Sequence, residues 1–176
     1  HVIDRKIAWG TKNMTKGSAM TREEAQQALE TGISMVEELK NKGYSLIATG
    51  EMGIGNTTTS SAVASVLLNE EVEKMTGRGA GLSSEGMTRK INAIKKAIEI
   101  NQPDPTDGVD VLSKVGGFDI AGMAGIFIGG AVYGVPIVID GFISAVAALA
   151  AARICPLVKE YMLASHVSKE PAAHLI

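Results

Sequence analysis

The sequence predicts an α/β fold: a doubly wound, mostly parallel sheet with helices on both faces. Short apolar runs rich in β-branched residues alternate with longer segments of helical periodicity. Polar, glycine-rich loops follow these runs, where a sheet of this kind places the ends of its strands and its ligands. The chain has 176 residues, of which 45% are hydrophobic, and can bury one core. We therefore expect a single domain over residues 1–176.

The first part of the chain has the pattern of a helix, a strand and a second helix. Thr21 and Glu24 form a capping box, and apolar residues recur at helical spacing from there to Asn41. The run over residues 44–49 is short and apolar, which favours a buried parallel strand. A second helix over residues 57–68 is expected after the glycine-rich loop that follows.

The middle of the chain is predicted to be helical. A third helix begins near Ser84 and ends before Pro103, with Lys90 off its apolar stripe. A short helix over residues 107–115 comes next. An apolar, glycine-rich helix follows Gly117, and its small residues permit close backbone contact in the core.

The last part of the chain contains the clearest strand. Residues 135–139 are rich in β-branched side chains, and Asp140 and Gly141 end the run. An alanine-rich helix over residues 143–153 follows. We expect residues 161–164 to form either a last strand or a helical piece.

The composition argues against several kinds of partner. With 17 basic and 19 acidic residues the net charge is -2, and no basic stripe is present, so nucleic acid is not expected. Cys155 is the single cysteine, which excludes internal disulfides and suits a reducing cytoplasm. The apolar stretches at residues 120–133 and 135–152 are too short or interrupted by Asp140, whereas a membrane span needs about 20 residues. No membrane association is expected.

The loop from Gly50 to Thr59 is the leading candidate for a binding site. It offers backbone N–H groups from Gly53 to Asn56, and then the Thr57 hydroxyl, at a helix N-terminus that attracts phosphate. Alternatively, the glycines serve only a tight turn and Thr57 caps the helix. A P-loop would need lysine where Asn56 stands, and the glycines of residues 77–81 lack the spacing of a dinucleotide fingerprint. Neither a nucleoside triphosphatase nor NAD binding is expected.

Three charged residues near these loops each allow two interpretations. Glu51 either points at a sugar hydroxyl or ring of a ligand or is an ordinary carboxylate at a helix end. Lys90 either neutralises a phosphate or belongs to a solvated helix face. Asp140, at the end of a strand, either faces a ligand or caps the next helix. His166 has no second histidine or cysteine at a metal-ligand spacing, so we expect no metal.

Four segments together resemble the family of nicotinate-nucleotide:dimethylbenzimidazole phosphoribosyltransferases. They are G-E-M-G-I-G-N-T-T-T at residues 50–59, G-R-G-A-G-L at 77–82, V-G-G-F-D-I-A-G-M-A-G at 115–125 and V-I-D-G-F-I-S at 138–144. The likeness runs in order from Ala19 to Pro171. It implies a Rossmann-like nucleotide-binding domain of a homodimer that uses no metal or redox cofactor.

The resemblance also implies a reaction and a set of contacts. The family moves phosphoribose from nicotinate mononucleotide to 5,6-dimethylbenzimidazole, giving α-ribazole 5′-phosphate and nicotinate, in the synthesis of the lower ligand of cobalamin. The positions that match its substrate contacts are Met52, Gly53, Asn56, Thr57, Gly77, Gly79, Lys90, Asp140, Gly141, Ser165 and Ser168. Phosphate and ribose would lie against Gly53, Gly79, Lys90 and Ser168, and nicotinate or sugar against Asn56 and Thr57. Glu51 is the candidate catalytic carboxylate within the chain.

The chain departs from the family pattern in one respect. The glutamate that the family uses as its main base belongs to an L-G-E-G-T-G-A stretch, which is not found in these residues. The family's benzimidazole pocket and small helical domain also draw on residues outside 1–176. We therefore expect a fragment of the nucleotide-binding domain that is inactive or weakly active alone. The alternatives are a non-catalytic nucleotide-binding module and a relative that uses another base or a phenol as acceptor.

Overall fold

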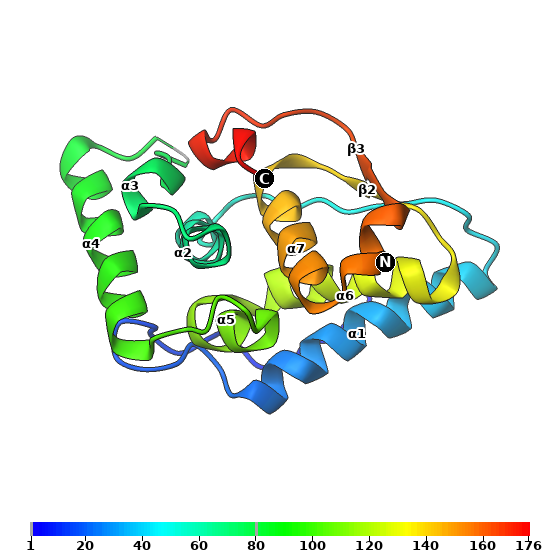
Figure 1. Ribbon diagram of the computed structural model, residues 1–176. Coiled ribbons are helices and arrows are strands. Elements are labelled where there is room, and N and C mark those ends of the chain that lie inside the picture. Colours follow the sequence, from blue (N-terminus) through cyan, green and yellow to red (C-terminus); the bar gives the residue numbers. More distant parts are fainter. Residues whose placement is uncertain (1, 80) are drawn as a thin grey trace.

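The structure of the chain is a computed structural model that describes residues 2–79 and 81–176. Its α-helices are α1 (Arg22–Asn41), α2 (Thr57–Leu68), α3 (Val72–Met75), α4 (Ser84–Asn101), α5 (Gly108–Val115), α6 (Phe118–Tyr133) and α7 (Gly141–Ile154). Its strands are β1 (Ile47–Ala48), β2 (Ile137–Ile139) and β3 (Met162–Ala164), and its 3-10 helices are η1 (Pro156–Tyr161) and η2 (Pro171–His174). In Figure 1, α1, α6 and α7 lie below the small sheet, and α3 and α4 lie to its left.

The three strands form one parallel sheet in the order β1-β2-β3. Ile47 pairs with Ile137, and Ile137 pairs with Met162 on its other side. All three strands therefore end at the same edge of the sheet, and the loops that follow them leave from that edge. The predicted α/β class with a parallel sheet is confirmed.

The two faces of the sheet differ in burial. Ile137 is fully buried, and α6 packs against its side chain at Gly130. Leu163 and Leu46 belong to the opposite face and are 47% and 54% exposed. The prediction of a parallel strand within residues 44–49 is confirmed. Its predicted length and burial are wrong, because β1 is only two residues long and the described helices leave one side of this run in contact with solvent.

The helices begin and end close to the predicted positions. The Thr21 hydroxyl accepts a hydrogen bond from the Glu24 N–H at 3.1 Å, and the Glu24 carboxylate accepts one from the Thr21 N–H at 2.7 Å. This confirms the capping box at the start of α1. Residues 162–164 form a strand, which decides between the two predicted alternatives. The short helices α3, η1 and η2 were not predicted.

Helices α1 and α6 cross at a backbone contact made by glycines (Figure 1). A Cβ atom at Gly32 would lie 2.7 Å from the Ile126 nitrogen, and one at Gly125 would lie 2.8 Å from the Leu29 carbonyl carbon. Real Cβ atoms do not approach this closely, so both positions require glycine. The crossing confirms the close contact predicted for the glycine-rich helix and gives α6 a fixed place under β2.

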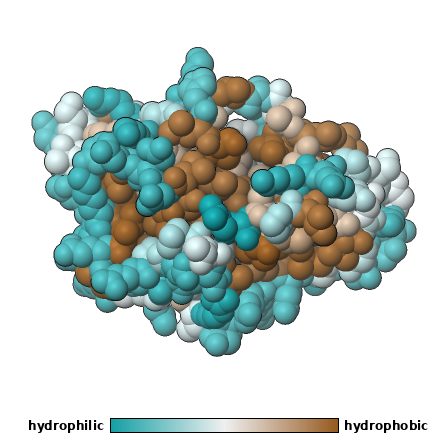
Figure 2. Space-filling view, in the orientation of Figure 1, coloured by the Kyte–Doolittle hydropathy of each residue, from teal (hydrophilic) through white to brown (hydrophobic). Residues whose placement is uncertain are grey.

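Apolar side chains gather over the middle of one face, where α2 and α7 lie, and hydrophilic ones cover the outer side of α4 (Figure 2). In the part of the chain that the structure describes, no helix combines the length and the apolar character needed to cross a bilayer.

The crossing of α1 and α6 predicts opposite effects for two similar substitutions. Gly125→Ala should lower the free energy of unfolding by about 1–3 kcal/mol, because its methyl group would overlap the backbone of Leu29. Gly122→Ala, on the same helix, is the matched control, since its Cβ would lie 4.0 Å from the Ala28 oxygen. Alanine favours helix over glycine by about 1 kcal/mol, so this variant should be neutral or more stable. Urea denaturation measures both, and equal destabilisation would contradict the explanation.

Candidate functional site

The loops after β1 and β2 line a cavity of about 270 Å³ at the edge where the strands end. We call it the strand-end cavity. Its lining residues are Glu51, Met52, Gly53, Ile54, Thr57, Gly79, Asp140, Gly141, Phe142, Ile143 and Glu170. Most of the predicted site residues are among them. Segments far apart in the sequence thus meet at this edge, as parallel strands require.

The loop between β1 and α2 is bent by glycines and closed by its own carboxylate. Gly53 and Gly55 have φ angles of 74° and 82°, a left-handed conformation that glycine adopts without strain. The Glu51 carboxylate accepts a hydrogen bond from the Gly53 N–H. The Gly53 amide, expected to be free for phosphate, is therefore occupied by Glu51. At the start of α2, the N-cap residue Asn56 makes no side-chain cap, so the first turn keeps its donors.

Lys90 on α4 is buried behind this loop. Its side chain is 6% exposed, although Lys95 on the same helix is solvated. The expectation that Lys90 lies off the apolar stripe of the helix is therefore wrong. Its ammonium group donates to the Thr57 hydroxyl at 3.0 Å and to the Gly77 carbonyl at 3.0 Å. An ammonium group has three donors, so one remains beyond these two bonds.

Burial lowers the pKa of Lys90 below its ordinary value, and the negative charge of Glu170 opposes that shift. A desolvated ammonium group is costly unless it has partners. The two hydrogen bonds and the nearby carboxylate supply them. An anionic group of a ligand next to Lys90 would therefore interact with a largely buried positive charge.

The second glycine cluster packs against these groups. Gly79 has a φ angle of 53°, and a Cβ atom there would lie 3.0 Å from the Thr57 hydroxyl oxygen. A side chain at Gly79 would therefore disturb the hydroxyl that Lys90 contacts. Ala80, in the middle of the same motif, lies outside the described residues. Gly77 does not line the strand-end cavity, but its carbonyl orients Lys90.

Asp140 faces the cavity from the end of β2. It is the N-cap residue of α7, but its side chain makes no capping hydrogen bond, which excludes the structural alternative. Gly141 follows with a φ angle of 79°. The Asp140 carboxylate lies 3.6 Å from Nδ1 of His166, and both side chains are more than half exposed. Asp140 and Glu51 thus bring two carboxylates to adjacent strand ends.

Besides Gly77 and Lys90, three predicted residues lie outside the strand-end cavity. Asn56 is buried and donates to the Asp119 carboxylate at 2.7 Å, toward α6, while its own Oδ1 has no partner among the described residues. Ser165 and Ser168 line a neighbouring, more apolar cavity of about 500 Å³, which also contacts Gly141. The Ser165 hydroxyl donates to the Ile139 carbonyl at 2.6 Å.

Sequence reasoning missed part of the lining. Ile54, Phe142 and Ile143 give the cavity apolar walls, and Glu170 contributes a carboxylate from the segment before η2. Glu170 lies directly before Pro171, where the family resemblance ends, and that position was the available signal. Nothing in its spacing connects it with Lys90.

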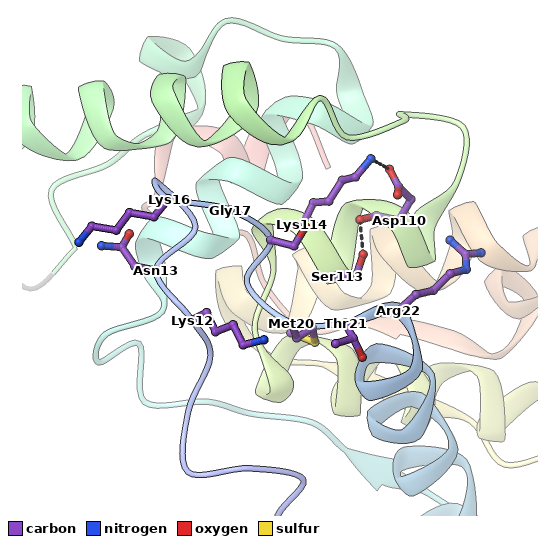
Figure 3. Close-up of a pocket in the computed structure, with 11 residues that line it drawn as sticks. Lys12, Asn13, Lys16, Gly17, Met20, Thr21, Arg22, Asp110, Ser113 and Lys114 are labelled. Atoms are coloured by element: carbon purple, nitrogen blue, oxygen red, sulfur yellow. Dashed lines mark hydrogen bonds and ion pairs between the residues drawn. The ribbon is translucent and has the colours of Figure 1, made fainter.

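A larger cavity of about 700 Å³ lies at the start of α1 (Figure 3). Four cations line it, but two already have partners: Lys114 lies 2.9 Å from Asp110, and Arg22 lies 2.7 Å from Asp107. Figure 3 shows the side chain of Lys16 directed away from the other lining residues. This cavity contacts none of the strand ends. We therefore take the smaller strand-end cavity as the candidate site.

Across residues 2–79 and 81–176, no group of histidine, cysteine, aspartate and glutamate side chains has the arrangement of a metal site.

The sequence of the chain is similar to those of known proteins. A model of a family described as phosphoribosyltransferase matches residues 1–176. The nicotinate-nucleotide–dimethylbenzimidazole phosphoribosyltransferase of Acetivibrio thermocellus is 60% identical over 172 residues, which are 98% of this chain and 49% of that protein. The protein of the same name from Clostridium acetobutylicum is 59% identical over 175 residues, which are 99% of this chain and 50% of that protein. The chain thus spans about half the length of these curated relatives.

The fold of the chain is also similar to that of a solved structure. The crystal structure of CobT from Thermus thermophilus superimposes with a TM-score of 0.92 at 37% identity. The match covers 98% of this chain and 52% of that one.

Proposed function

We propose that this chain, which belongs to the phosphoribosyltransferase family, forms the donor-binding part of a nicotinate-nucleotide:dimethylbenzimidazole phosphoribosyltransferase. In this proposal, residues 1–176 are the nucleotide-binding domain. The donor is nicotinate mononucleotide, the acceptor is 5,6-dimethylbenzimidazole, and the products are α-ribazole 5′-phosphate and nicotinate.

The observation that carries the proposal is the distribution of charge around the strand-end cavity. Glu51 and Asp140 bring negative charge from the strand ends, and Lys90 supplies positive charge behind Thr57, with Glu170 as its nearby carboxylate. Nicotinate mononucleotide carries a positive charge on its pyridinium nitrogen and negative charge on its phosphate. The cavity is therefore complementary to the two ends of the donor, the phosphate toward Lys90 and the ring nitrogen toward the carboxylates.

The chemistry fits a site without a general acid at the leaving group. When the bond between the ribose carbon and the pyridinium nitrogen breaks, nicotinate leaves with the electron pair and its ring becomes neutral. A nitrogen of the acceptor forms the new bond on the opposite face of that carbon, and a carboxylate accepts its N–H proton. The site must mainly position both partners and stabilise positive charge at the ribose carbon. Glu51 and Asp140 are proposed for this electrostatic role.

The remaining assignments follow from the family resemblance. Gly53, Gly79 and Ser168 are proposed beside the phosphate and ribose, together with Lys90, and Gly77 is a further proposed substrate contact. Met52, Asn56 and Ser165 are proposed substrate contacts although two of the three lie outside the strand-end cavity. The main catalytic base is proposed to belong to a part of the protein beyond residues 1–176.

Two further properties are proposed from the same resemblance. The protein would work in the cytoplasm, and it would be a homodimer. Light scattering of the purified protein tests the second property, with a dimer mass as the expected result.

A binding measurement tests the proposed donor site. The chain should bind nicotinate mononucleotide, and Lys90→Ala should weaken binding by about 1–3 kcal/mol, or about 5- to 150-fold, because the phosphate loses a desolvated cation. Lys95→Ala is the matched control, since Lys95 is on the same helix and pairs with Glu73 at the surface. Isothermal titration calorimetry measures all three chains. Equal affinity of the Lys90 variant and the native chain would refute the phosphate assignment.

A second ligand separates the two charged ends of the site. Asp140→Asn should lower the affinity for nicotinate mononucleotide by about threefold to tenfold, because a half-exposed carboxylate no longer faces the pyridinium charge. Ribose 5-phosphate lacks that charge, so its affinity should stay equal or rise. Competition binding with both ligands checks this difference. A parallel loss for both ligands would mean that Asp140 acts on the fold of the loop.

A further inference from the structure

Glu170 is a partly buried carboxylate that the proposed reaction does not use. It precedes η2, and one of its carboxylate oxygens, Oε2, is buried without a hydrogen-bond partner among the described residues. Its nitrogen donates to the Ser168 hydroxyl at 3.3 Å, so the backbone of this segment is anchored. An unpartnered buried carboxylate oxygen is costly, and a nearby positive charge is the usual compensation.

Gly77 brings this carboxylate close to Lys90. A Cβ atom at Gly77 would overlap the Glu170 carboxylate and would lie 2.8 Å from the Pro171 side chain. The carbonyl of the same residue accepts the hydrogen bond from Lys90. The ammonium group and the carboxylate therefore lie against the same glycine. Among the residues described, they do not form an ion pair within 4.0 Å, so their interaction acts through space.

Other charges around α4 have partners of their own. Helices α2, α3 and α5 pack against α4, and their charged residues are Glu73 and Lys74 on α3 and Asp110 and Lys114 on α5. Arg78 lies in the loop that precedes α4, and His174 lies on η2, which packs on α3 and α7. Glu73 pairs with Lys95, Lys74 with Glu70 and Glu71, and Asp110 with Lys114. Arg78 donates to the Leu82 carbonyl. Helix α2 carries no charged residue.

The carboxylates of the strand ends are also engaged elsewhere. Glu51 accepts from the Gly53 N–H, and Asp140 lies beside His166. Glu170 is the one carboxylate whose charge opposes the lowering of the Lys90 pKa by burial. It is therefore the available counter-charge for the buried ammonium group.

We infer that Glu170 is a positioning residue, which keeps the buried Lys90 protonated and aimed at Thr57 so that it can receive the phosphate of the donor. This inference rests on the proposed function for the identity of the phosphate, but not for the effect of Glu170 on Lys90. Glu170 acts through Lys90 and needs no contact with the reacting atoms.

The role has a consequence that a purely structural role would not have. Removing the Glu170 carboxylate removes a negative charge that repels the phosphate of the donor, which favours binding as long as Lys90 stays protonated. It also makes Lys90 lose its proton at lower pH, which disfavours binding in alkaline solution. The two effects have opposite signs, so the affinities of native and variant chains should cross as pH rises.

The direct test is an NMR titration of Lys90 in the chain labelled with isotopes at its lysines. The signal of Lys90 is identified as the one that is lost in the Lys90→Arg variant. In Glu170→Gln the pKa of Lys90 should fall relative to the native chain, because the carboxylate that opposes the effect of burial is gone. Glu160→Gln removes an equal charge from an exposed position on η1, which packs on α6 and α7, and should leave Lys90 unchanged. Glu170→Ala provides the same measurement if the buried amide of the glutamine variant disturbs folding. An unchanged Lys90 titration in the folded variant would overturn the inference.

The binding test uses nicotinate mononucleotide over the same pH range. In Glu170→Gln, affinity should equal or exceed that of the native chain near pH 7 and be about tenfold weaker above the pKa of the variant's Lys90. Parallel profiles would overturn the inference. If the native chain does not bind the ligand at any pH, the proposed function fails, and the NMR titration still decides the role of Glu170.

Discussion

The burial of one ammonium group, that of Lys90, governs the rest of the candidate site. Removing a lysine charge from water is costly, and the chain offsets the cost with the Thr57 hydroxyl and the Gly77 carbonyl. A Cβ atom at Gly79 would crowd the Thr57 hydroxyl, and one at Gly77 would overlap the Glu170 carboxylate, which explains glycine at both positions. A cation held in this way is preorganised for an anion, because its two hydrogen-bond partners are uncharged.

The parallel sheet and the glycine crossing of α1 and α6 place the two carboxylates of the strand ends. Because the strands are parallel, the loops after β1 and β2 leave from the same edge and carry Glu51 and Asp140 together. The contact between Gly32 and Gly125 fixes α6 against α1, and α6 leads directly into β2. The negative side of the site therefore depends on the frame of the fold, and the positive side on the burial of a single side chain.

Local signals in the sequence predicted the frame well, but not the burial of individual groups. The Thr21 capping box, the β-branched run before Asp140 and the glycine loop after β1 each depend on neighbours in sequence, and each was found. Lys90 was predicted to resemble the exposed lysines of α4, because periodicity alone does not show that the start of α2 and the loop at Gly77 cover its side chain. Glu170 was missed for the same reason, since its partner comes from a distant helix. The length of β1 depends on sheet neighbours that the sequence pattern does not reveal.

The central claim is that the strand-end cavity, with Lys90 behind it, holds the phosphorylated donor. Backbone amide NMR during a titration with nicotinate mononucleotide tests it most directly, because each amide reports its own surroundings. The account predicts that the largest shifts fall on Gly53, Thr57, Gly79 and Gly141, which line that cavity. Shifts concentrated instead on residues 12–22, around the larger basic cavity at the start of α1, would contradict it.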